Sequence, residues 1–197
     1  MRCLCALLLL LVLVTQAAAA DALQELRASF TIAGKPVPPD VFGDFGDAMM
    51  SDGRPIVVTI DALAAMDSNR YADPIKSNGP WFVQEKPQNQ GINGAESMSY
   101  KFVGATQNGL LIAVTAWSGG GTGVFHWLHI VDAAWANAFD DDGASYRRLN
   151  LTNLRSYSLG DRWDGTVTIS GNTLRVETAS TRGGQRPPVV TLQAKRP

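Results

Sequence analysis

The sequence predicts a mainly β protein, all-β or α+β, in which an antiparallel meander forms a sandwich or a partly closed barrel with a small irregular or helical N-terminal part. From Ser99 onward, apolar and polar residues alternate with a period of two, which is typical of half-buried strands. The turn sequences Gln107-Asn108-Gly109 and Ser170-Gly171-Asn172 each separate two such runs and predict hairpins. About six or seven short strands at regular spacing favour an antiparallel sheet.

The N-terminal part predicts smaller elements, which we expect to cover one edge or one end of the sheet. Residues 41–50 have apolar positions near a period of 3.6 but contain two glycines, so helix and strand both stay open there. The other expected elements are a helical turn at 21–27, strands at 29–32, 55–60 and 81–83, either strand or helix at 61–66, and a loop at 68–78.

The remainder of the chain predicts most of the strands. They are expected at 100–103, 110–117, 123–131, 165–169, 173–177 and 189–194, with a turn at 140–143. Residues 149–157 are apolar without a clear period, so strand and helix both stay open. The polar segment 85–96 predicts a long surface loop or a boundary between subregions 21–90 and 91–197 of a single domain.

The first 20 residues have the pattern of a secretory signal peptide. A positive start at Arg2 precedes an apolar run at 7–14 that is too short to span a bilayer, and four alanines follow at 17–20. We expect cleavage after Ala20 and a secreted or periplasmic domain over residues 21–197. Both cysteines, Cys3 and Cys5, lie before that cut, so the mature domain has neither a disulfide nor a thiol nucleophile.

Charge and residue spacing argue against several classes of partner. Without Arg2, 16 basic residues face 18 acidic ones and no basic stripe is present, so nucleic acid is not an expected partner. No later apolar run approaches the length of a transmembrane segment. We expect no metal, because His126 and His129 would point to opposite faces of a strand and Asp140-Asp141-Asp142-Gly143 lacks the EF-hand pattern. No cofactor is expected either.

Two polar or glycine-rich turns are the candidate ligand site. The first contains Ser118, Gly119, Gly120 and Gly121, where glycines allow positive φ and close approach of a ligand to the backbone. The second contains Asp161, Arg162 and Trp163, where a charged pair adjoins an indole that we interpret as an exposed stacking platform. Structural alternatives stay open for both: a sharp connection between strands for the first turn, and an ionic clasp for the second.

Five tryptophans are many for this length. We expect Trp127 to be core, and Trp135 and Trp163 to lie exposed in loops. For the two histidines, the simplest interpretation is one half-buried residue and one on the surface.

The same two turns carry a family resemblance. The sequences 117–125 and 156–165, together with 33–36 and 51–55, resemble a family of uncharacterised secreted bacterial proteins with a GGG[ST]G-x-F turn and a downstream SLGDRWDG segment. The resemblance covers most of the mature chain and assigns no activity, catalytic residue or cofactor.

The function that these patterns favour is a non-enzymatic extracytoplasmic binding or interaction module of unknown ligand or protein partner. One alternative is a secreted hydrolase that uses Ser118 or Asp161; the first stands in a loose variant of the nucleophile elbow, with His126 or His129 as base. Another alternative is a structural or inhibitor-like protein that acts through the loop at 84–96. We assign no catalytic residue.

Overall fold

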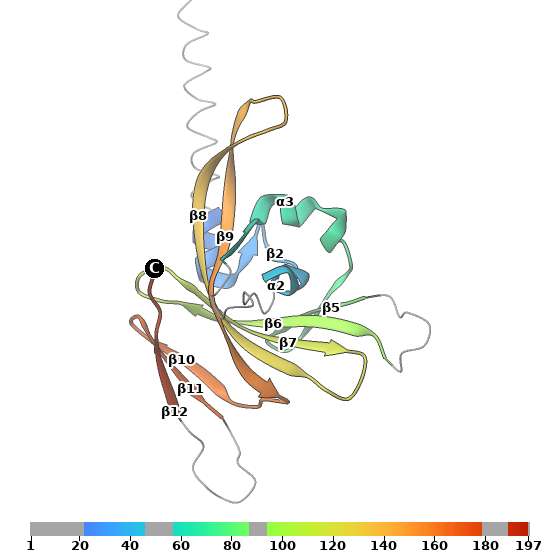
Figure 1. The fold of residues 1–197 in the computed structure, drawn as a ribbon, viewed down its shortest axis with the longest axis vertical. Coiled ribbons are helices and arrows are strands. Elements are labelled where there is room, and N and C mark those ends of the chain that lie inside the picture. Colours follow the sequence, from blue (N-terminus) through green and yellow to red (C-terminus); the bar gives the residue numbers. More distant parts are fainter. Residues whose placement is uncertain (1–21, 46–56, 87–93, 179–188, 197) are drawn as a thin grey trace, which may run out of the picture.

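The computed structural model describes residues 22–45, 57–86, 94–178 and 189–196, and its main feature is a seven-stranded antiparallel sheet (Figure 1). The prediction of a mainly β, antiparallel fold with a small helical N-terminal part is therefore confirmed. Across the sheet the strands are β3 (Val58–Asp61), β9 (Ser145–Asp161), β8 (Phe125–Phe139), β7 (Leu111–Gly119), β6 (Glu96–Ala105), β5 (Trp81–Glu85) and β4 (Ile75–Asn78). Strands from both sides of residue 90 pair within it, so the two subregions share one sheet.

Two smaller sheets and short helices complete the described chain. The C-terminal sheet consists of β10 (Thr166–Ser170), β11 (Thr173–Glu177) and β12 (Val189–Gln193), and the N-terminal ribbon of β1 (Thr31–Ile32) and β2 (Lys35–Pro36). Residues 22–29 are helical. The other helical elements are α2 (Asp40–Phe45), α3 (Ala62–Asp67) and the 3₁₀ turn η1 (Asn69–Tyr71).

Local chemistry explains where the helices begin. Asp61 caps α3, because its carboxylate accepts hydrogen bonds from the backbone N–H groups of Leu63 and Ala64. Pro38 and Pro39 precede α2 and accept its first backbone hydrogen bonds, at 3.1 and 3.0 Å, from Val41 and Phe42. The sequence had left helix and strand open at 41–50 and at 61–66, and the structure is helical at Asp40–Phe45 and at Ala62–Asp67.

The N-terminal elements cover a face of the large sheet, which corrects the expectation that they cover an edge or an end. Phe30 is the centre of this contact: its ring lies 5.6 Å from that of Phe42 and 5.3 Å from that of Tyr100 on β6. The small C-terminal sheet packs on the opposite face. In Figure 1 the helices lie on one side of β6 and β7, and β10–β12 lie on the other.

Because both faces are covered, the central strand β7 is buried along most of its length. Leu111 and Ala113 belong to the helix-covered core, whereas Leu110, just before the strand, and Ile112 and Val114 belong to the core beneath the C-terminal sheet. The side chains of consecutive residues point to opposite faces, so one uninterrupted apolar run serves both cores.

Several sequence predictions of secondary structure are confirmed and others need correction. Both hairpins form, with positive φ at Gly109 and Gly171, and the turn at 140–143 is present. Residues 149–157 are strand. The strand expected at 123–131 extends to Phe139, and the loop expected at 68–78 contains η1 and β4. The signal sequence, residues 46–50 of the segment 41–50, and most of the segment 84–96 lie outside the described residues.

Candidate functional site

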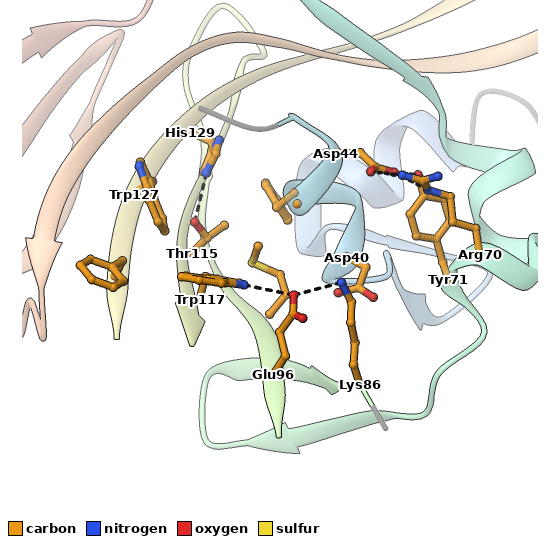
Figure 2. Close-up of a pocket in the computed structure, with 14 residues that line it drawn as sticks. Asp40, Asp44, Arg70, Tyr71, Lys86, Glu96, Thr115, Trp117, Trp127 and His129 are labelled. Carbon is orange, nitrogen blue, oxygen red and sulfur yellow. Dashed lines mark hydrogen bonds and ion pairs between the residues drawn. The ribbon is translucent and has the colours of Figure 1, made fainter. Parts of the chain in front are cut away.

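A cavity of about 630 Å³ lies between the helix-covered face of the sheet and the short helices (Figure 2). It forms where β6, β7 and β8 extend beyond the cover that α2 provides. The helix side is lined by Asp40, Phe42, Gly43 and Asp44 of α2 and by Arg70 and Tyr71 of η1. Side chains of the three strands line the sheet side.

Strand register explains the aromatic wall of the cavity. Trp117 is paired with Met98 on one neighbouring strand and with Phe125 on the other, so these three side chains form one row across the sheet. The next row towards the core holds Thr115 opposite Trp127. The rings of Trp117 and Phe125 are stacked at 6.1 Å, and Phe125 is 42% exposed. The wall therefore presents a continuous aromatic surface that reaches solvent.

Two ion pairs lie at the edge of the cavity. The Asp44 carboxylate accepts hydrogen bonds from the Arg70 guanidinium, at 2.8 Å from Nε, and from the Tyr71 hydroxyl. Burial opposes ionisation of Asp44, but these hydrogen bonds outweigh it and hold its pKa below the usual value. The pKa of Tyr71 rises to about 12, because burial and the hydrogen bond to Asp44 both favour the protonated phenol.

The second pair joins Lys86, just after β5, to Glu96 at the start of β6. The Lys86 ammonium lies 3.1 Å from Glu96 Oε1, and the indole N–H of Trp117 donates to the same oxygen at 3.3 Å. These hydrogen bonds, the one from Lys86 first, lower the pKa of Glu96. The contact with Glu96 also fixes the plane of the Trp117 ring against the cavity.

Asp40 differs from the other two carboxylates among the described residues that line the cavity. Its backbone N–H donates to the side chain of buried Gln84, whose amide nitrogen also donates to the carbonyl oxygens of Tyr71 and Asp73. Gln84 thereby fastens α2 and η1 to the sheet. Burial raises the pKa of the Asp40 carboxyl, and the nearby positive charge of Lys86 only partly offsets this.

His129 closes the inner end of the cavity as a neutral group. Its Nε2 lies 3.0 Å from Thr115 Oγ1, and its Nδ1 lies 3.0 Å from Ser156 Oγ, which accepts a hydrogen bond from Asn153. Burial lowers the pKa of His129 to about 4, so the ring is uncharged at neutral pH. Because protein groups occupy both ring nitrogens, His129 serves as a fixed part of the wall.

The two turns predicted as a ligand site meet in the structure, but their residues do not line this cavity. The backbone N–H of Val124 donates to Asp161 Oδ1 at 2.8 Å, and the backbone N–H of Arg162 donates to the Val124 carbonyl at 2.7 Å. The Arg162 guanidinium donates to the Thr122 carbonyl and pairs with Asp161 Oδ2 at 2.9 Å. These contacts form a clasp between turns, which was the structural alternative.

The glycines of the first turn serve close packing. Gly120 has a φ of +84°, and a Cβ at Gly94 would lie 2.5 Å from its carbonyl oxygen. A Cβ on Gly119 would lie 3.1 Å from the Trp117 ring, whereas Gly121 faces open space. Ser118 Oγ accepts a hydrogen bond from the backbone N–H of Gly120 at 3.3 Å, so the hydroxyl stabilises the turn itself.

Trp163 is buried, which corrects its predicted role as an exposed stacking platform. Its side chain is 8% exposed and packs in the core beneath the C-terminal sheet, where its backbone N–H lies 3.3 Å from His126 Nδ1. Gly165 permits this position, because a Cβ there would lie 2.6 Å from the Trp163 ring. The indole fills space that opens when the chain turns back to begin β10.

Three other aromatic predictions also need correction. Trp127 was expected in the core and lines the cavity, and Trp135 was expected in a loop and lies on β8 beneath the Arg147 guanidinium. His126 and His129 do point to opposite faces, but both are buried, because each face of the sheet is covered. A surface histidine was therefore the wrong expectation.

The cavity was not predicted from the sequence, although the sequence holds one signal for it. Trp117 has the strand parity of Thr115, and Trp127 that of Phe125. A hairpin closed through the glycine-rich turn places all four side chains on one face. The lining residues on α2 and η1 are distant from these strands in sequence, so no local pattern predicts that they lie opposite them.

Comparison with known proteins yields no relative: no family model, curated protein or solved structure matches the chain. The resemblance to secreted bacterial proteins therefore stays a prediction. Throughout the described ranges no helix is long and apolar enough to cross a membrane. The same ranges contain no group of three or more histidine, cysteine, aspartate or glutamate residues arranged to hold a metal ion.

Proposed function

We propose that this protein is an exported, non-enzymatic binding protein that holds a small, partly apolar molecule in the cavity between α2 and strands β6–β8. The observation that carries the proposal is the aromatic row of Trp117 and Phe125 beside Trp127, open to solvent at one end and bordered by charged groups. Ligand pockets commonly combine such apolar walls with a few fixed polar groups, and their volumes lie in roughly the range of 300–1,000 Å³.

Binding fits the chemistry of the cavity better than catalysis does. The His129 ring is neutral and hydrogen-bonded through both nitrogens, while the carboxylates of Asp44 and Glu96 are paired with cations. Ser118 and Asp161, the residues of the hydrolase alternative, stabilise turns. Export rests on the apolar run at 7–14 and the alanines that follow it.

Gly43 allows a direct test of the proposed cavity. A Cβ on this helical glycine would lie 3.6 Å from the Met98 methyl group, so a side chain added here points from α2 towards β6. Gly43→Leu should fill the cavity, whereas Gly43→Ala adds one methyl group and, as a better helix former, should leave the fold as stable or more stable.

The experiment is a thermal-shift screen of small metabolites against the mature protein. Hits are then measured on both variants by calorimetry. We expect ligands that retain affinity for Gly43→Ala and lose at least about tenfold with Gly43→Leu, a change of about 1.4 kcal/mol. Hits that bind Gly43→Leu as tightly as the unmodified protein, or a screen without any hit, would contradict binding at this site. Mass analysis of the exported product tests processing, with Asp21 as the expected first residue.

A further inference from the structure

We propose, on the basis of the binding function above, that the cavity selects a ligand with a cationic amine or ammonium group on an apolar body, with Asp40 as the counter-ion. Two features of the described residues lead to this inference: an excess carboxylate at the edge of the cavity, and aromatic faces opposite it.

The charges around the cavity do not cancel. Among the described lining residues, three carboxylates face two cations, because Arg70 pairs with Asp44 and the ammonium of Lys86 is hydrogen-bonded to Glu96. Asp40 is the carboxylate that remains. Figure 2 shows it beside Lys86, at the border between the charged and the aromatic parts of the cavity. A cation entering here would compensate a partly buried negative charge.

The pKa of Asp40 is shifted in the direction expected for a partly buried carboxylate whose charge is incompletely compensated. Loss of solvation raises its pKa, even though Lys86 acts in the opposite direction. His129 does not supply a further positive charge, because its ring is neutral at pH 7. The field inside the cavity therefore favours a cation over an anion.

The aromatic side chains favour the same ligand. Trp117, Phe125 and Trp127 present rings from the sheet, and Phe42 and Tyr71 present rings from the helix side. Aromatic faces attract ammonium groups, and the effect increases when water is excluded. The apolar body of the ligand would lie along the stacked rings of Trp117 and Phe125. Its charged end would then point towards Asp40.

Three probes of nearly the same shape test the choice of charge. They are 2-phenylethylammonium, neutral 2-phenylethanol and anionic phenylacetate, titrated by calorimetry and by the fluorescence of the cavity tryptophans. We expect the ammonium probe to bind at least about tenfold more tightly than the alcohol, and the carboxylate to bind most weakly. Asp40→Asn should bring the ammonium and alcohol affinities to within about threefold, while Asp40→Glu should keep the preference.

The control is Asp141→Asn, which removes one carboxylate from an exposed turn far along the chain and should leave the preference unchanged. Circular dichroism and the melting temperature establish that each variant is folded. Equal affinities for the three probes, or a preference that survives Asp40→Asn, would overturn the cationic ligand and leave the binding function standing. The same holds if no probe binds but the screen finds ligands sensitive to Gly43→Leu. Failure of both experiments would remove both proposals.

Discussion

The two faces of the seven-stranded sheet are covered in different ways. Beneath β10–β12, Ile112, Val114 and Leu174 are fully buried, because a second, smaller sheet packs directly on this part of the face. The opposite face is covered by residues 22–30 and by two helices of six residues each. This cover buries Leu111, Ala113 and Thr115 but ends before Trp117, which is only partly buried and lines the cavity. The cavity thus arises where a short cover meets a longer strand.

The largest expected effect separates the closed face, which is the face beneath β10–β12, from the open face, which is the helix-covered face with the cavity. Ile112→Ala leaves a void that the packed sheets cannot close, so we expect a loss of about 3–4 kcal/mol in the free energy of unfolding. Met98→Ala enlarges a cavity that already exists and should cost about 1 kcal/mol. Urea denaturation of both variants measures the difference. Equal losses would show that the helix-covered face is packed as tightly as the other.

The next effect concerns His129 on the open face. Burial holds its pKa at about 4, while an unfolded chain has a histidine pKa of about 6.5. Above pH 6.5 the ring is neutral in both states. As the pH falls from about 6.5 to about 4, the unfolded state binds the proton more readily, so about 3 kcal/mol of the free energy of unfolding is lost.

His129→Gln should flatten that pH dependence, which denaturation at a series of pH values will show. His126→Gln is the matched change on the closed face, where burial also lowers the histidine pKa. A larger change in the pH dependence of the free energy of unfolding for His126→Gln than for His129→Gln would contradict this expectation. It would show that protonation of the histidine costs more on the closed face.

The smallest effect is expected at the clasp between the two turns. Asp161→Ala removes the acceptor of the Val124 N–H and the partner of Arg162, at an exposed position, so we expect a loss of about 1 kcal/mol. Asp161→Asn keeps a hydrogen-bond acceptor and should cost less. Ligand affinity in both variants should equal that of the unmodified protein. A specific loss of affinity would instead indicate that the ligand binds at the two turns that the sequence predicted as the site.

The local elements could be predicted from the sequence because their signals are local. Period-two alternation and the turn residues at Gln107-Asn108-Gly109 and at Ser170-Gly171-Asn172 fix two hairpins. The glycine-rich turn and the segment at Asp161 were predicted to form one candidate site, and hydrogen bonds do join them. Their binding role was inferred from composition, which does not distinguish a turn that holds itself from one that holds a ligand.

The cavity could not be predicted because it depends on contacts between distant segments. Gln84 ties α2 and η1 to β5 through backbone groups that carry no sequence signature. Trp163 is the opposite case, because a side chain that was predicted to be exposed is buried. Polar neighbours and glycines suggested exposure, but the return of the chain into β10 buries the indole. Burial is a property of the assembled layers, so it appears only when both covers are known.

The position of β3 has a consequence for how the chain acquires its structure. This strand pairs with β9, and the contact between the hydroxyls of Thr59 and Thr152 spans 93 residues. Long-range pairing of this kind slows folding, because the entropy cost of closing a large loop comes before the stabilising contacts form. The N-terminal helices can complete their packing on the sheet only after β9, the last long strand, has formed. Slow maturation of this kind is compatible with the proposed export, in which the chain crosses a membrane before it folds.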